Sequence, residues 1–188
     1  MNNRNTNLIR SVITALLIAI GIVIPMIVPK IVIGPMSFTL ASHVAIFIAM
    51  FISPPAAIAV ALGTTVGFFF TGLPIIIVWR AFSHIVFTVI GSYMLKKMPN
   101  VLMSARSYTL FSLLMAVIHA VCEVIVVTVF FFGGLISKQM LASGYFVSVI
   151  LLVGLGTVVH SMIDFQISVF VWKPLSRMVQ FPVSAKAK

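Results

Sequence analysis

The amino-acid sequence predicts an all-α integral membrane protein, a single membrane domain over residues 1–188 that forms one compact bundle of six transmembrane helices. Its 188 residues are 62% hydrophobic and 7% charged, whereas an ordinary soluble domain carries roughly 25% charged residues. Apolar runs recur along the whole chain, separated by proline, glycine and basic residues. The formal net charge of +10 does not indicate a nucleic-acid partner, because the basic residues mark the ends of apolar runs and form no stripe within a polar domain.

The first expected span covers about residues 8–28. It ends in Pro25 and Pro29, and proline stops or kinks a helix. The basic residues before it superficially resemble a signal peptide, but the apolar run reaches about twenty residues and no A-x-A cleavage site follows it. We therefore expect an uncleaved span. Ala15 and Ala19 lie four residues apart on it, and such small residues let another helix approach closely.

The next expected elements are a loop and two shorter spans. Residues 30–39 contain a Gly-Pro pair and are expected to form a loop rather than a helix. This loop is unusually apolar, which suggests that it folds over something. A short span is expected at about 40–52, closed by Pro54 and Pro55, and another at about 56–71. The 40–52 run alone barely reaches across a bilayer, since a crossing helix needs about twenty residues.

Three further spans are expected at about 75–95, 108–132 and 145–172, followed by a basic tail at 173–188. Six spans place both termini on the same side of the membrane. One side would then collect nine basic residues: Arg4, Arg10, Lys96, Lys97, Arg106, Lys173, Arg177, Lys186 and Lys188. The other side would collect two, Lys30 and Lys138. Because cytoplasmic loops carry the excess of Lys and Arg, we expect cytoplasmic termini and outward-facing loops at 30–39 and 133–144.

Ionisable side chains inside the apolar runs are the strongest functional signal. They form three pairs spaced four residues apart: Arg80 with His84, His119 with Glu123, and His160 with Asp164. Each pair would lie on one face of its helix, and the pairs contain the only two acidic residues of the chain. The fourth histidine, His43, lies in another apolar stretch. Ionisable groups at membrane depth are costly and face a bundle interior or a wet cavity, so a polar site between helices is expected.

The rise of an α-helix per residue gives the depth of each pair in the membrane. Counted from the basic residues that end each span, Arg80 and Glu123 fall in the outer third of the membrane, with His84 and His119 just below them. His160 falls near the middle, at a depth similar to that of His84 and His119, so the three histidines could meet. Asp164 falls deeper. We therefore expect Arg80, His84, His119 and Glu123 to form an outward-facing pocket, and His160 with Asp164 to act as a structural lock.

Aromatic residues lie near the same outer ends. Phe38, Trp79 and Tyr145 flank the spans or the loops above them, where their rings could enclose a flat ligand. The alternative is an interfacial aromatic belt, in which Trp and Tyr are enriched in any membrane protein.

The ionisable residues also allow other interpretations. One alternative is that they only hold the helices together, with Arg80 neutralising Glu123; such contacts contribute typically under about 2 kcal/mol. Three imidazoles and a carboxylate would suit zinc, but the HxxxE and HxxxD spacings lack the HExxH order of zinc proteases. HxxxD occurs in intramembrane proteases of the CAAX-processing type, yet their EExxxR element is absent. We expect no metal, no cofactor and no catalytic residue, with Cys122 a packing residue.

Across nearly its whole length the sequence resembles the substrate-binding S components of energy-coupling factor (ECF) vitamin transporters. The resemblance rests on the basic amino terminus, six spans, the Ala15 and Ala19 pair and a Pro/Gly-containing first outer loop. It also rests on two stretches, SFTLASHVAIFIAMFISPPAAIAVALGTTVGFFFTG and GTVVHSMIDFQISVFVWKPL.

This resemblance implies a protein of the bacterial plasma membrane that captures a vitamin or vitamin precursor at the outer face. A membrane scaffold subunit, met by Ala15 and Ala19, and two cytoplasmic ATPases would drive uptake. The chain itself would not be an enzyme, in agreement with the absence of a GxxxxGK[ST] phosphate-binding loop. The alternatives are an ATP-independent transporter or channel acting as an oligomer and, more remotely, an intramembrane metalloprotease.

The chemistry of the expected pocket narrows the substrate. Arginine suits a carboxylate or hydroxyl, and glutamate and histidine suit ring nitrogens and hydroxyls. We expect Arg80, His84, His119, Glu123 and His43 to bind a small heteroaromatic compound such as hydroxymethylpyrimidine, pyridoxine or nicotinate. Pantothenate is also possible.

Overall fold

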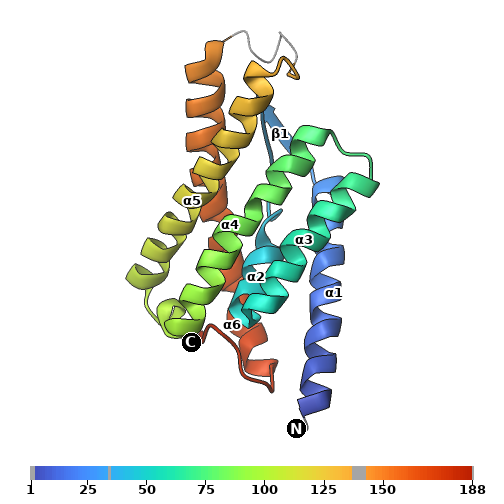
Figure 1. Ribbon diagram of the computed structural model, residues 1–188. Helices are drawn as coiled ribbons and strands as arrows, with labels where there is room; N and C mark the ends of the chain where they lie inside the picture. The colour runs from blue at the N-terminus through green and yellow to red at the C-terminus, as the bar shows by residue number, and fades with distance from the viewer. Residues whose placement is uncertain (1–2, 34, 137–142, 188) are drawn as a thin grey trace.

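The computed structural model describes residues 3–33, 35–136 and 143–187, which form a helical bundle with one small β-hairpin (Figure 1). In chain order the elements are α1 (Asn3–Ile27), β1 (Lys30–Ile33), β2 (Met36–Thr39), α2 (Val44–Ile52), α3 (Pro54–Phe70), α4 (Ile75–Lys97), the 3-10 turn η1 (Val101–Met103), α5 (Ala105–Phe132), the π-helical η3 (Phe146–Leu155) and α6 (Gly156–Met178). The helical class expected from the sequence is what the described residues show. Both termini lie at the same end of the bundle (Figure 1).

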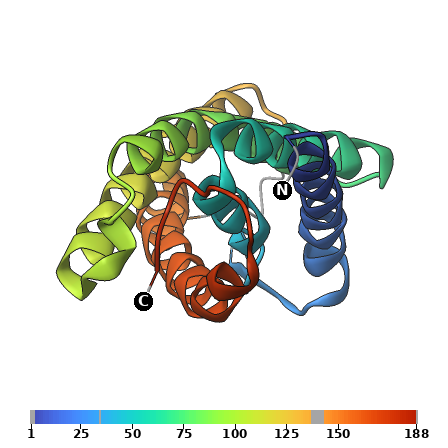
Figure 2. The ribbon, with the colours of Figure 1, turned by 90° about the horizontal axis from the view of Figure 1, so that it is seen from below.

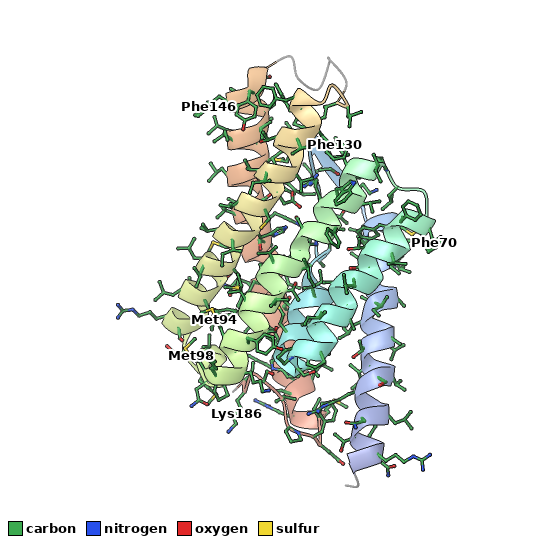
Figure 3. The ribbon with its side chains drawn as sticks, viewed as in Figure 1. Phe70, Met94, Met98, Phe130, Phe146 and Lys186 are labelled. Atoms are coloured by element: carbon green, nitrogen blue, oxygen red, sulfur yellow. The ribbon has the colours of Figure 1, made fainter. Side chains whose placement is uncertain are left out.

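Four helical segments within the described residues are long and apolar enough to cross a membrane: Arg4–Ile27, Ile75–Lys97, Ala105–Phe132 and Phe146–Met178. The shorter α3 has 17 residues and α2 has 9. Large apolar side chains project from the outside of the bundle, such as Phe70 and Phe146, which are 80% and 63% exposed (Figure 3). An apolar exterior of this kind suits lipid contact.

Helix α2 lies at the centre of the molecule. All nine of its residues are buried, and it packs against α1, α3, α4 and α6 (Figure 2). It ends at Ser53, which is extended because Pro54 follows it. The Ser53 hydroxyl then accepts a hydrogen bond from Ala56 N at 3.4 Å and caps α3, with Pro54 at the first helical position.

The expected loop at 30–39 is a β-hairpin, which corrects the sequence interpretation. β1 and β2 pair antiparallel, with Lys30 opposite Thr39 and Ile31 opposite Phe38. The β-branched run that forms β1 favours an extended strand. β1 is exposed, whereas β2 buries Met36 and Thr39 against the bundle. The apolar character of this segment therefore reflects a hairpin that covers the helices.

Glycine at position 156 lets the hairpin approach the start of α6. A Cβ atom at Gly156 would lie 2.7 Å from Met36 Sδ and 2.8 Å from Phe38 Cζ, closer than real Cβ contacts. The hairpin thus packs directly on the α6 backbone. This contact fixes the position of Phe38.

After the loop that follows α5, η3 continues directly into α6, so the two form one long helical segment. α6 runs past the expected end of the span at residue 172 and continues to Met178, with Pro174 inside it. The described part of the 133–144 loop ends at Ile136 and resumes at Ser143, so Lys138 lies outside the described residues.

The tail that the sequence describes only as basic folds back under the bundle. Ser184 N and Ala185 N donate to the carbonyl oxygens of Ile52 and Phe51 at 3.1 and 2.9 Å. Trp172 Nε1 donates to Ala185 O at 3.0 Å. Carbonyl groups at a helix C-terminus lack partners within the helix, so the tail caps α2. Figure 2 views the bundle from this end.

Aromatic packing forms the core between this cap and the polar region. Phe47, Phe51, Phe87, Phe165 and Trp172 are almost completely buried. The Phe47 and Phe165 rings meet at 5.1 Å and the Phe51 and Phe165 rings at 5.7 Å. Above this core, the next side chains along α4, α5 and α6 are ionisable.

Candidate functional site

The ionisable residues converge on one cavity from five elements. The hairpin, the residue preceding α2, and helices α4, α5 and α6 contribute Lys30, Phe38, His43, Arg80, His84, His119, Glu123, Thr157 and His160 to its lining. The centre of a water molecule has about 80 Å³ available to it there. The cavity therefore suits a small ligand of about one ring.

Glu123 on α5 organises the α4 side of the cavity. Its Oε2 lies 2.6 Å from Arg80 Nη2 and accepts a hydrogen bond from Arg80 Nε at 2.7 Å. Its Oε1 lies 3.4 Å from both His84 Nε2 and His119 Nε2. Thr157 Oγ1 on α6 donates to Oε2 at 3.5 Å. The expected pairing of Arg80 with Glu123 is thus present, and it joins α4 to α5.

Asp164 on α6 holds together the residues on the opposite side of the cavity, next to the start of α2. Its Oδ1 accepts from Ala41 N at 2.7 Å, and its Oδ2 accepts from His43 N at 2.9 Å and from His43 Nδ1 at 3.0 Å. His43 precedes α2 and makes no side-chain cap of its own. Asp164 therefore caps the N-terminus of α2 from another helix, and holds Ala41 in its left-handed conformation with φ of 66°. This is a locking contact of the kind expected for Asp164.

His160 lies with the outer group rather than apart from it in a lock with Asp164 alone. It lines the cavity, with its Nε2 3.3 Å from Asp164 Oδ2 and its ring 5.0 Å from that of His43. The similar depth that the helical rise gives to His84, His119 and His160 is consistent with this position.

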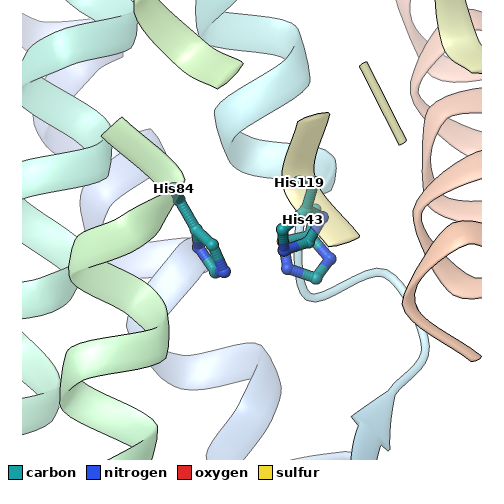
Figure 4. A group of neighbouring side chains, drawn as sticks. All are labelled: His43, His84 and His119. Carbon is teal, nitrogen blue, oxygen red and sulfur yellow. The ribbon is translucent and has the colours of Figure 1, made fainter. Parts of the chain in front are cut away.

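His43 lies at the centre of the four histidines. Its ring centroid is 4.8 Å from those of both His84 and His119, and the latter two are 4.7 Å apart. Figure 4 shows the His84 ring pointing from α4 toward the rings of His43 and His119. One ligand atom from each of these three residues lies within 4.8 Å of the others, and His43, His160 and Asp164 form a second such group.

The aromatic residues expected to enclose the ligand behave differently from one another. Phe38 lines the cavity and stacks on His160, with the ring centroids 4.7 Å apart and the planes 20° apart. Trp79 is 49% exposed and contacts Phe82. Tyr145 Oη hydrogen-bonds with Thr128 Oγ1 at 2.9 Å. Trp79 and Tyr145 are not among the residues that line this cavity, so their expected role as ligand-enclosing rings stays a prediction.

Several lining residues were not singled out from the sequence as site residues, among them Lys30, Ser42 and Thr157. Lys30 served there only as evidence of topology, and Ser42 and Thr157 drew no attention. Ser42 Oγ lies 3.1 Å from His160 Nε2. Its position next to His43 was the signal that could have identified it. Ala15 and Ala19, by contrast, lie on the exposed face of α1, away from the cavity.

A helical membrane protein with a small, polar, largely buried cavity belongs to the class of membrane proteins that bind and transport small molecules. No protein-family model matches the chain, and no solved structure matches it. The chain is 39% identical over 156 residues to the niacin transporter NiaX of Lactococcus lactis subsp. cremoris (strain MG1363), which covers 82% of this chain and 68% of that protein. The chain belongs to the family of S components of energy-coupling factor vitamin transporters, and it functions in vitamin uptake across a membrane.

Proposed function

We propose that this protein captures niacin, as the nicotinate anion, and delivers it for uptake as the S component of an ECF transporter. The observation that carries the proposal is the 39% identity over 82% of the chain to a niacin transporter. The lining of the cavity supports it independently. Nicotinate combines one aromatic ring, one ring nitrogen and one carboxylate, and the cavity offers a complement to each.

The carboxylate would bind near Arg80 and Lys30. Arginine has five N–H donors, of which Glu123 engages those of Nε and Nη2, so further donors stay available to a ligand. Lys30 at the hairpin end of the cavity supplies a second positive charge. Charge-assisted hydrogen bonds of this kind are roughly twice as strong as neutral ones.

The ring would lie near the stacked pair of Phe38 and His160. Offset or edge-on aromatic contacts are worth about 0.5–1.5 kcal/mol beyond the burial of their area. The roughly 80 Å³ open to the centre of a water molecule leaves room for several waters or a small ring compound.

In the membrane, we propose six spans with cytoplasmic termini, the hairpin facing outward, and residues 1–188 forming one membrane domain in the bacterial plasma membrane. The short α2 and α3 would count as spans two and three. A membrane scaffold would dock on α1 at Ala15 and Ala19, and two cytoplasmic ATPases would hydrolyse ATP. This chain would be a binding subunit and no enzyme.

The test is equilibrium binding to the purified chain alone. Titration calorimetry with nicotinate, nicotinamide, pyridoxine, hydroxymethylpyrimidine and pantothenate should give saturable binding of one nicotinate per chain. Nicotinamide lacks the carboxylate and should bind more weakly. Preference for another vitamin would overturn the niacin proposal, and failure of all five to bind to folded protein would overturn the proposed capture function.

A further inference from the structure

We propose that His43, His84 and His119 bind one divalent transition-metal ion of the zinc class beside the vitamin cavity. Imidazole is a preferred ligand of Zn²⁺, Co²⁺ and Ni²⁺. The three residues come from three separate elements: the N-terminus of α2, α4 and α5. All three are buried, with exposures of 7%, 8% and 0%. The site is thus built inside the bundle and is not a surface cluster.

The geometry lies within reach of a metal complex. The three ligand atoms lie within 4.8 Å of one another. Ligand nitrogens of a tetrahedral zinc ion are about 3.3 Å apart, given Zn–N bonds of about 2.0–2.1 Å. Modest rotations of the imidazole rings, whose centroids are 4.7–4.8 Å apart, would close that difference.

Hydrogen bonding prepares His43 to be a ligand. An ionised carboxylate can only accept hydrogen bonds, so Nδ1 of His43 carries the proton that it shares with Asp164 at 3.0 Å. The other nitrogen, Nε2, therefore keeps its lone pair. A carboxylate that fixes the tautomer and orientation of a metal-binding histidine in this way is common in metal sites. Glu123 Oε1 hydrogen-bonds with Nε2 of His84 at 3.4 Å and can do the same for that ring.

His119 supplies a second, independent observation. Its side chain is fully buried, and neither ring nitrogen has a hydrogen-bond partner among the described residues. Its Nε2 lies 3.4 Å from Glu123 Oε1 but outside hydrogen-bond geometry. A buried polar group without a partner destabilises a protein by about 1–3 kcal/mol. A metal ion at the centre of the three rings would supply the missing partner.

The overlapping group of His43, His160 and Asp164 is the weaker metal site. Both oxygens of Asp164 already accept backbone N–H groups, from Ala41 and from His43. If this carboxylate coordinated a metal ion, it would lose the hydrogen bonds that cap α2. Asp164 is therefore better suited to orient His43 than to bind the metal.

Three histidines leave the fourth position of a tetrahedral ion open to the cavity that the same residues line. The carboxylate or ring nitrogen of nicotinate is a chemically suitable fourth ligand. This last step rests on the proposed function, whereas the metal site itself does not.

The test uses the full chain, purified without a polyhistidine tag and treated with a chelator. Co²⁺ is added, and the visible ligand-field absorption and the bound metal per chain are measured. We expect one Co²⁺ per chain, displaced by Zn²⁺. His84→Gln and His119→Gln should each weaken metal binding by more than about tenfold, which is the lower end of the effect of losing even a supporting partner of a metal ligand. Thermal unfolding reports whether each variant folds.

Cys122→Ala is the control, because the thiol is a metal-binding side chain that lies outside the three-histidine group and outside the lining of the cavity. It should keep the Co²⁺ spectrum. Absence of bound metal in the folded wild-type chain would overturn the proposal, as would loss of metal in Cys122→Ala with retention in His84→Gln. Nicotinate binding is measured on the same samples. Binding of nicotinate without any metal uptake would reject the metal site and leave the proposed function standing. Metal uptake without nicotinate binding would reject the proposed function and leave the metal site standing.

Discussion

The two carboxylates divide the polar side chains of the cavity between them. Glu123 contacts Arg80 and two histidines, and Asp164 contacts the other two histidines and the backbone before α2. Because each carboxylate has several partners, removing either one would leave buried polar groups unpaired. Informative substitutions therefore keep the charge or the shape of the side chain.

Arg80→Lys should weaken nicotinate binding by about ten- to a hundredfold, the effect of losing a hydrogen bond to a charged group. Lysine keeps a positive charge beside Glu123 but lacks the planar set of donors that binds a carboxylate at two points. Titration calorimetry measures the change. Trp79→Ala on the same helix is the control, since Trp79 lies outside the cavity. Equal affinity in the wild type and Arg80→Lys would remove Arg80 from the binding site.

Asp164→Asn should lower the stability of the protein by about 1–3 kcal/mol, because one oxygen acceptor and the negative charge are lost from the cap of α2. Thermal unfolding of the purified chain measures this. Ser176→Ala on the same helix removes only a local hydrogen bond to Lys173 O and should leave stability nearly unchanged. An unaltered melting temperature in Asp164→Asn would show that the cap contributes little.

At the scale of elements, the hairpin and α1 are the two parts that lie outside the central packing. The hairpin contributes Lys30 and Phe38 to the cavity and rests on the backbone of α6 at Gly156. α1 packs on α2 and α3 and exposes Ala15 and Ala19. The hairpin is therefore suited to ligand binding, and α1 to contact with another protein.

Gly156→Val should weaken nicotinate binding several-fold while the protein still folds. The new side chain would displace Met36 and Phe38, which leave only 2.7 and 2.8 Å to a Cβ atom. Gly154→Ala is the control, because its Cβ would meet Val124 on α5 at 3.2 Å and not the hairpin. Full affinity in Gly156→Val would show that the position of Phe38 does not matter for binding.

Ala15→Trp and Ala19→Trp should leave nicotinate binding intact and abolish uptake, because a bulky side chain prevents close helix approach. Binding is measured on purified protein, and uptake in cells that contain the transporter partners. Leu16→Trp changes a neighbouring exposed position of α1 and should permit uptake. Normal transport by the two alanine variants would contradict the docking role.

At the scale of the whole molecule, the proposed orientation can be tested with single cysteines. In a Cys122→Ala background, Lys30→Cys should react with a membrane-impermeant maleimide added to intact cells. Lys97→Cys should react only after the cells are opened. Both lysines are exposed in the structure, so each position is accessible to the reagent. The reversed pattern would place the termini outside and reject the positive-inside assignment.

Much of the helical layout could be predicted from the sequence, because proline and glycine end helices locally. α4 begins at Ile75 and α5 ends at Phe132, where the sequence places them. The convergence of Arg80, His84, His119 and Glu123 also followed from spacing and depth.

Contacts between distant parts of the chain could not be predicted in this way. A four-residue strand pairs too briefly to leave a periodic signal, so the hairpin was missed. The stacking of Phe38 on His160 depends on the position of that hairpin. The capping of α2 by Asp164 and by the tail involves single side-chain or backbone groups more than a hundred residues away from it, which no local pattern reveals.

The two caps of α2 have a consequence for synthesis. This buried helix, made early in translation, receives the partners of its N-terminal backbone from Asp164 and those of its C-terminal backbone from Ser184 and Ala185. These groups follow α2 by more than a hundred residues, so α2 has no complete set of hydrogen bonds until they have been synthesised. The final assembly of the bundle must therefore wait for the segments that contain them. A ribosome-stalled chain that ends before Asp164 should remain sensitive to proteases in the membrane.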